Sequence, residues 1–259
     1  MDLAVQSEFE SKAAALRDTG ICVLPGAIAP QDVAAARDTI VAQQTWFPRT
    51  RQAAHSRHLA GFHRFEELRS VLDLIGDNPT LQRFLDHVFG GAEFRDFGLS
   101  DITINRSQPW HTDLLRGRYA QFLDGVDVWD ADAPPCLKAL LYLQNGKSLR
   151  LVAGSHHEDL PLDDAVLDRI ANERNIDQLE LGTGDIVVMD IRTLHRGSTD
   201  QEMAAPALAT TPKILVSNVY GVPGTPFADA MSAGNAARLA SWDERNNIAG
   251  PPGRGQRSA

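Results

Sequence analysis

Hydrophobic and polar positions follow two different periods along this chain. Toward the N-terminus, apolar residues recur every three or four positions, as on one face of an α-helix. This spacing predicts a helix over residues 5–18, a second beginning at Pro30, and two helices within residues 68–89. The apolar run at residues 21–24 has the length and composition of a strand.

After Gly90 and Gly91 the pattern changes to short apolar runs separated by turn residues. Strands are predicted at residues 93–97, 101–105, 137–143, 149–152, 179–181, 186–191 and 214–220. One helix, at residues 163–173, interrupts them, and an amphipathic stretch at residues 227–245 predicts a last helix. Because helices do not alternate with the strands, we expect a mainly β protein with flanking helices, best fitted by a jelly roll.

No linker divides the chain of 259 residues, so we expect one domain over residues 1–248 and a disordered Gly/Pro/Arg/Ser tail at residues 249–259. The first residues lack the pattern of a secretory signal, and no run of about 18 apolar residues suggests a membrane span. We therefore expect a soluble, cytoplasmic protein.

Charge and cysteine usage exclude further classes. A net charge of −9 argues against general nucleic-acid binding, although Arg49, Arg57 and His58 belong to a locally basic run. Cys22 and Cys136 lie far apart, which predicts two buried, reduced thiols and neither a disulfide framework nor a cysteine-based zinc site.

His111 and Asp113 are separated by one residue, so on a strand they point to the same face. His195 follows the predicted strand at residues 186–191, where a strand end meets the mouth of a barrel. Two histidines and a carboxylate are the facial triad of non-haem Fe(II) enzymes. The other histidines have no comparable strand-end setting, and the main rivals, His156 and His157, are expected in a loop after a strand.

Four stretches resemble, in order and spacing, the phytanoyl-CoA dioxygenase family of Fe(II)/2-oxoglutarate-dependent oxygenases. They are residues 16–26, 110–113, 152–156 and 184–197. The resemblance implies a double-stranded β-helix (jelly roll, cupin-like) core. It further implies Fe(II) held by His111, Asp113 and His195, with 2-oxoglutarate and O₂ as cosubstrates.

The activity implied by this resemblance is hydroxylation of an unactivated C–H bond, with release of succinate and CO₂. Similar halogenases replace the carboxylate ligand by a small residue, so the intact Asp113 favours hydroxylation. The expected substrate is a small metabolite or natural-product intermediate.

The chain departs from the family where the cosubstrate should be anchored. Similar proteins place an arginine shortly after the distal histidine, but residues 201–206 contain none. Lys213 and Ser217 share one face of the next predicted strand and are the candidate anchors for a carboxylate; Arg196 is the second candidate. The alternative is that Lys213 merely caps the edge of a strand.

Candidate substrate contacts lie after the second ligand. Arg116, Arg118 and Trp129 belong to a loop over residues 114–135, and Lys138 begins the next strand. A solvated loop and a strand-edge lysine are the structural alternatives. Two other functions stay open: a catalytically silent jelly-roll module that binds a metal or ligand, and metal-assisted hydrolysis, which fits the ligands but not the surrounding motifs.

Overall fold

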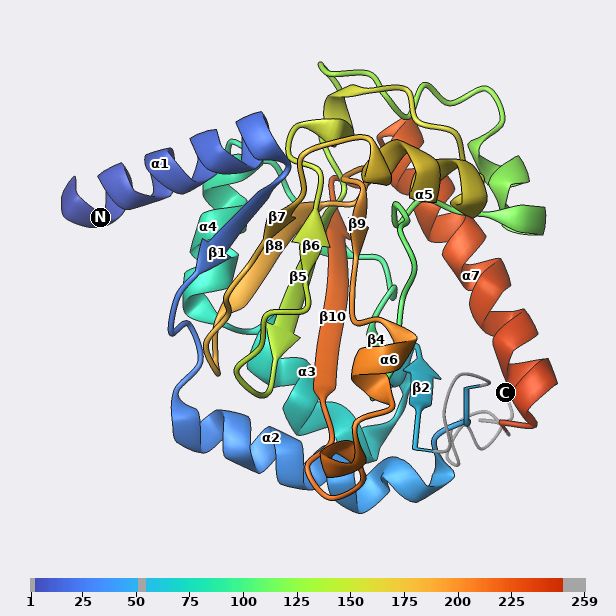
Figure 1. The fold of residues 1–259 in the computed structure, drawn as a ribbon. Coiled ribbons are helices and arrows are strands. Elements are labelled where there is room, and N and C mark those ends of the chain that lie inside the picture. The colour runs from blue at the N-terminus through green and yellow to red at the C-terminus, as the bar shows by residue number, and fades with distance from the viewer. Residues whose placement is uncertain (1–2, 51–54, 249–259) are drawn as a thin grey trace, which may run out of the picture.

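Two antiparallel sheets form the centre of the molecule (Figure 1). The computed structural model describes residues 3–50 and 55–248. The larger sheet has the order β1 (Ile21–Leu24), β8 (Ile186–Asp190), β5 (Leu137–Tyr142), β10 (Ile214–Gly221), β4 (Asp101–Ile104) and β2 (Arg57–Ala60), and β3 (Arg95–Asp96) pairs with β10. The smaller sheet has the order β7 (Asp177–Gln178), β6 (Arg150–Leu151) and β9 (His195–Arg196). This architecture confirms the predicted jelly roll.

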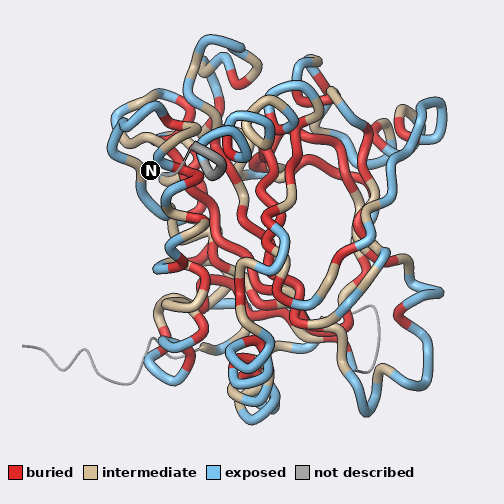
Figure 2. The backbone as a smooth tube through the Cα atoms, turned by 90° about the vertical axis from the view of Figure 1, so that its left-hand side faces the viewer, coloured by how far each residue is buried: buried red, intermediate tan, exposed pale blue. Residues whose placement is uncertain are grey.

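Helices surround the two sheets. The α-helices of the described residues are α1 (Leu3–Thr19), α2 (Pro30–Gln43), α3 (Arg69–Gly76), α4 (Pro79–Val88), α5 (Asp164–Asn172), α6 (Asp200–Met203) and α7 (Pro226–Asn246). Short 3₁₀ turns are η1 (Gln44–Trp46), η2 (Phe62–Arg64), η3 (Glu66–Leu68), η4 (Gly117–Leu123), η5 (Ser155–His157) and η6 (Pro206–Ala209). Figure 2 shows the buried segments of the chain in the interior and the exposed segments around them.

The larger sheet is buried on both faces, and β8 shows how its sequence achieves this. Ile186 and Val188 join the apolar cluster formed with helices α1 to α4, whereas Val187 and Met189 face the cluster shared with the smaller sheet. Successive side chains of a strand point to opposite faces, so a strand between two apolar layers must be apolar throughout. This requirement makes β8 easy to recognise in the sequence.

Local capping explains where several helices begin. The side chain of Asn78 accepts hydrogen bonds from the backbone N–H groups of Thr80 and Leu81, and Asp163 caps α5 in the same way. Pro30 and Pro79 occupy the first turn of α2 and α4, where a missing N–H costs nothing. At the predicted interruption, α3 therefore ends at Gly76 and Asn78 caps the start of α4.

Several details of the β-rich half were predicted wrongly. Residues 179–181 form no strand: their leucines pack in the core, and Leu181 makes only an isolated bridge to Gly146. The chain turns after β8, and His195 begins a separate strand of the smaller sheet. Strand β2 and helix α6 were not predicted.

Strand β10, which follows β9 in the chain, does not lie beside it. Strand β10 pairs with β3, β4 and β5, and β9 pairs with β6, so β10 and the strand of His195 lie in different sheets. Cys22 and Cys136 are buried, free thiols, as expected. No helix in the described ranges combines the length and the apolar character needed to cross a membrane. The tail predicted at residues 249–259 lies outside the described residues.

Gly184 lies in the turn before β8, and a substitution there tests how tightly this turn packs against the chain segment that precedes α2. Its φ is +88°, and an added Cβ would lie 2.3 Å from the carbonyl oxygen of Ile28. We expect Gly184→Ala to lower the free energy of unfolding by about 2 kcal/mol or more, measured by urea denaturation. The control is Gly76→Ala, where the Cβ meets open space at the end of α3 and the change should be neutral or slightly stabilising. Equal effects of the two changes would contradict this account.

Candidate metal centre

The three predicted ligands come together where two chain segments meet. His111 and His195 form an antiparallel bridge in which each backbone N–H donates to the carbonyl of the other residue, at 2.8 and 2.9 Å. The N–H of Asp113 donates to the carbonyl of Ile191, directly after β8, at 2.8 Å. The bridge continues the smaller sheet beyond β9. Residues 111–113 are thus held like a strand edge although they belong to no assigned strand.

Within this frame, the ligand atoms of His111, Asp113 and His195 all lie within 4.8 Å of one another. The Nε2 atoms of His111 and His195 lie 3.8 and 3.5 Å from the two carboxylate oxygens of Asp113. Both imidazoles are buried, whereas 17% of the Asp113 side chain is exposed. In the described residues this is the only group of three such side chains placed to share a metal ion.

The hydrogen bonds of the two imidazoles prepare them for metal binding. Nδ1 of His111 lies 2.7 Å from the carbonyl oxygen of Pro109, and Nδ1 of His195 lies 2.9 Å from that of Thr193. A carbonyl only accepts, so Nδ1 carries the proton and Nε2 presents a lone pair toward Asp113. Burial, and for His111 also the neighbouring imidazole, lowers the pKa of both histidines, which keeps them neutral.

Asp113 is ionised and already has one cationic neighbour. Burial alone would raise the pKa of its carboxyl, but the charge and hydrogen bonds of Lys138 outweigh burial and hold that pKa below its usual range. Nζ of Lys138 lies 2.9 Å from each carboxylate oxygen. Lys138, predicted as a substrate contact, thus reaches the centre from β5 and contacts a ligand residue.

The loop of Ser155, His156 and His157 was predicted to hold no metal ligand, and it supports the metal centre from outside. Ser155 Oγ accepts a hydrogen bond from the backbone N–H of Leu194 at 2.8 Å and donates to the carbonyl of Val152 at 2.6 Å. The rings of His156 and His157 each hydrogen-bond the carbonyl of Arg17 at the end of α1. These two histidines therefore tie η5 to α1 and stand apart from the metal ligands.

Two of the three candidate ligands, His111 and Asp113, line a cavity of about 280 Å³. Cationic side chains on its wall are Arg106, Arg116, Lys138 and Arg238. Of the predicted substrate contacts, Arg116 and Lys138 line this cavity. Arg118 instead hydrogen-bonds Tyr119 and Ser241 at the surface, and Trp129 packs in an apolar cluster beside Trp110.

Sequence reasoning missed a chain of charged groups on the other wall. Arg106 Nη1 lies 3.4 Å from His58 Nδ1, His58 Nε2 lies 3.1 Å from an oxygen of Asp101, and Arg238 donates to the other oxygen at 3.3 Å. The arrangement assigns the proton of His58 to Nε2, since a guanidinium can only donate. The one signal in the sequence was that the strand 101–104 begins at the charged residue Asp101 and is followed shortly by Arg106.

The candidate cosubstrate anchors lie apart from this cavity. Nζ of Lys213 hydrogen-bonds Ser148 and, at 2.5 Å, Ser198, and burial lowers the pKa of Lys213 to about 8. Ser217 is buried on the same face of β10. Arg196 lies on the opposite face of β9 from His195, with its guanidinium over the ring of Trp110.

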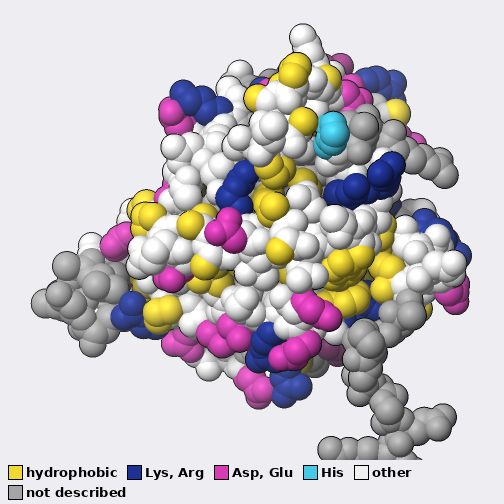
Figure 3. Space-filling model, turned by 90° about the horizontal axis from the view of Figure 1, so that it is seen from below, with side chains coloured by type: hydrophobic (Ala, Val, Ile, Leu, Met, Phe, Trp, Pro, Cys, Tyr) yellow, Lys and Arg dark blue, Asp and Glu magenta, His cyan; other side chains and the backbone are white. Residues whose placement is uncertain are grey.

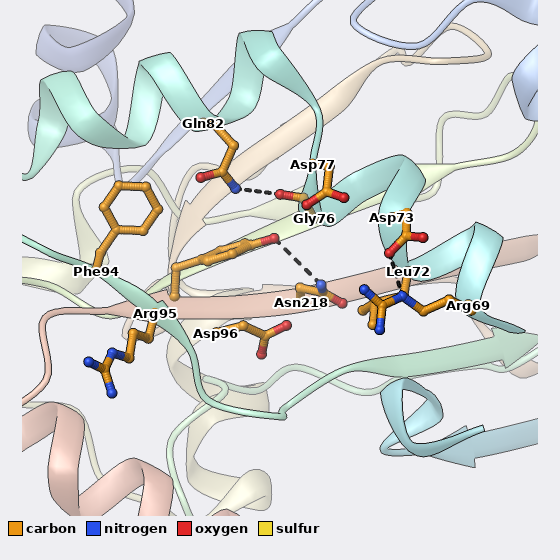
Figure 4. A pocket seen from close by; sticks show the side chains of 11 residues that line it. Arg69, Leu72, Asp73, Gly76, Asp77, Gln82, Phe94, Arg95, Asp96 and Asn218 are labelled. Atoms are coloured by element: carbon orange, nitrogen blue, oxygen red, sulfur yellow. Dashed lines mark hydrogen bonds and ion pairs between the residues drawn. The ribbon is translucent and has the colours of Figure 1, made fainter. Parts of the chain in front are cut away.

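A separate cavity of about 260 Å³ lies between the larger sheet and helices α3 and α4 (Figure 4). Its polar groups largely satisfy one another: Arg69 pairs with Asp73, and Gln82 donates to the carbonyl of Gly76. Its carboxylates do not converge on a common point in the way that the ligands of the metal centre do. The chemistry of the molecule is therefore expected at the centre formed by His111, Asp113 and His195.

Comparison with known proteins supports the fold. No protein-family model and no curated protein sequence matches the chain. The solved structure of SnoN, a non-haem α-ketoglutarate-dependent epimerase of nogalamycin biosynthesis, is 16% identical, covers 86% of this chain and 89% of its own, and has a TM-score of 0.60. SnoK, a carbocyclase of the same biosynthesis, is 16% identical, with 82% and 83% covered and a TM-score of 0.59.

HygX from Streptomyces hygroscopicus, solved with nickel, 2-oxoglutarate and hygromycin B, is also 16% identical, with 83% and 87% covered and a TM-score of 0.56. At these identities the likeness shows a shared fold. The chain has the jelly-roll fold of these 2-oxoglutarate-dependent enzymes.

Lys138 gives the centre a testable electrostatic property. Its ammonium and a divalent metal ion would share one carboxylate, and like charges about 4 Å apart repel by several kcal/mol at a protein site. We expect Lys138→Met to tighten Co(II) binding by about tenfold or more, measured by titration of the cobalt absorption. Lys147→Met, at a lysine paired with exposed Glu180, is the matched control and should leave the affinity unchanged. Weaker binding in Lys138→Met would show that the ammonium orients Asp113 for the metal.

Proposed function

We propose that the chain is an Fe(II)- and 2-oxoglutarate-dependent oxygenase that hydroxylates an unactivated C–H bond of a small metabolite or natural-product intermediate. The observation that carries the proposal is the convergence of two neutral imidazoles and one carboxylate, of which His111 and Asp113 line a cavity. Iron bound there would supply activation of O₂ coupled to decarboxylation of 2-oxoglutarate to succinate and CO₂.

The residues of this chain would do three things for that chemistry. His111 and His195 would hold the metal through Nε2, because the backbone carbonyls of Pro109 and Thr193 fix their Nδ1 protons. Asp113 would supply the anionic ligand, and its partly exposed side chain faces the cavity in which a substrate binds. The three ligands come from one side, which leaves the cavity side open for small molecules.

We propose Lys213 as the anchor of the distal carboxylate of 2-oxoglutarate, with the hydroxyls of Ser198 and Ser148 beside it. Its ammonium has no carboxylate partner among the described residues, and it contacts two hydroxyl groups that can also donate to a carboxylate. Ser217 would flank the cosubstrate on the same strand. Arg196 faces away, so Arg106, which lines the metal cavity, replaces it as the second candidate.

We propose hydroxylation as the reaction of this chain, although its structural neighbours carry out several different reactions. SnoN is described as an epimerase and SnoK as a carbocyclase, so this fold supports different oxidations. Asp113 supports hydroxylation over halogenation, because the carboxylate occupies the position that a halide would need. The second candidate function is a catalytically silent module, and its support is Lys138, whose ammonium already neutralises Asp113.

The first experiment separates an oxygenase from a silent module. Anaerobic addition of Fe(II) and then 2-oxoglutarate should produce a weak visible charge-transfer band, and addition of O₂ should release succinate. His111→Ala should abolish both signals, because it removes a ligand. His157→Ala removes an imidazole that hydrogen-bonds the carbonyl of Arg17 and packs against His156, apart from the three candidate ligands, and it should retain them. Full succinate formation by His111→Ala would exclude this metal centre, and absence of the band in the wild type would favour the silent module.

The second experiment tests the cosubstrate anchor. Lys213→Met should raise the dissociation constant of 2-oxoglutarate by about tenfold to a hundredfold, because a hydrogen-bonded charge pair is lost. The readout is the charge-transfer titration at saturating Fe(II). Lys213→Arg keeps a cation on the strand and should restore most of the affinity. An unchanged dissociation constant in Lys213→Met would move the anchor to Arg106.

A further inference from the structure

A second cavity, of about 350 Å³, adjoins the metal cavity. Its lining residues are Arg49, Thr50, His58, Arg106, Trp242, Arg245 and Asn246. His58 and Arg106 line both cavities, so the two share a wall. We call this second cavity the arginine pocket.

The arginine pocket offers hydrogen-bond donors and positive charge. Three guanidinium groups line it, and none of the described residues on its wall is acidic. The indole N–H of Trp242 is buried and has no acceptor among the described residues. A buried donor without an acceptor is unfavourable, so this N–H indicates that a ligand with acceptor atoms completes the pocket.

Two carboxylates near the pocket, Asp243 and Asp101, already pair with other groups. Asp243, next to Trp242 on α7, forms a bidentate pair with Arg64. Asp101 accepts from His58 and Arg238. The ring of His58 adds no positive charge, since burial and the charge of Arg106 lower its pKa to about 4. The positive charge of the pocket therefore remains available to a ligand.

The concentration of arginines here contrasts with the rest of the molecule. The chain has a net charge of −9, and on the face seen in Figure 3 acidic side chains are interspersed with basic ones. Arg49 also forms a backbone bridge with Arg57, a fourth arginine in this region. Like charges held together repel unless an anion lies between them.

We infer that the arginine pocket binds an anionic group of the substrate, a phosphate, sulfate or carboxylate, while the rest of that substrate extends past Arg106 into the metal cavity. This inference rests on the proposed oxygenase function. Arginine forks recognise such planar or tetrahedral oxyanions through paired N–H donors. The distal carboxylate of 2-oxoglutarate is a different anion, for which we propose Lys213, a residue that lines neither cavity.

The pocket is tested with inorganic phosphate, sulfate and acetate at constant ionic strength, by calorimetry and by the tryptophan emission to which Trp242 contributes. We expect saturable binding of at least one of these anions. Arg49→Gln and Arg245→Gln should each weaken it by about tenfold or more. Arg83→Gln removes an arginine on α4 that contacts only the carbonyl of Pro79, and it should bind as the wild type does. Thermal unfolding of each variant checks that it is folded.

Two further arms separate this inference from the proposed function. His111→Ala should bind the anion like the wild type, because the pocket needs no metal. Succinate release should then be compared for pairs of compounds that differ only in the anionic group identified, and Arg49→Gln should raise KM for the charged member about tenfold with little change in kcat. Absence of saturable binding, or unchanged binding in both arginine variants, overturns the pocket. Anion binding without any succinate formation keeps the pocket and overturns the oxygenase.

Discussion

The pair of backbone hydrogen bonds between His111 and His195 is the constraint on which the site depends. Each residue donates to and accepts from the other, so two segments far apart in the sequence are locked in one register. Once that register is set, the carbonyls of Pro109 and Thr193 lie within reach of the two Nδ1 atoms and turn both Nε2 lone pairs toward Asp113. Ser155 and the turn after β8 secure the same register from the other side.

The electrostatics of the site follow from burial. A carboxylate and two imidazoles removed from water need compensating charge, and Lys138 provides it while the histidines remain neutral. The same ammonium would compete with a bound divalent cation for Asp113, so the stability of the folded chain and the proposed affinity for metal would be opposed at this position. Arg106 and Arg238 extend the positive potential along the cavity wall, where Asp101 balances part of it.

Much of the fold could be predicted because its strands and helices obey local rules. Strand β8 is apolar on both faces, and Asn78 marks the start of α4, so both are visible in the sequence. The wrong predictions concern which strands pair with one another. Leu181 is as apolar as a strand residue but has no ladder partner beyond Gly146, and the strands of His195 and Lys213 lie in different sheets although they are neighbours in the sequence. Alternation assigns a face to a side chain; it does not choose the partner strand.

The same distinction explains the candidate site. The ligand triad was visible because one residue separates His111 from Asp113, and a strand edge converts that spacing into a shared face. Arg106 was invisible because its role depends on His58 and Trp242, which reach it from β2 and α7. Arg106 lines both the metal cavity and the arginine pocket, so its guanidinium can contact an anionic substrate that spans the two. In the function that we propose, substrate choice therefore depends on long-range packing of α7 against the barrel, whereas metal binding depends on two short sequence segments.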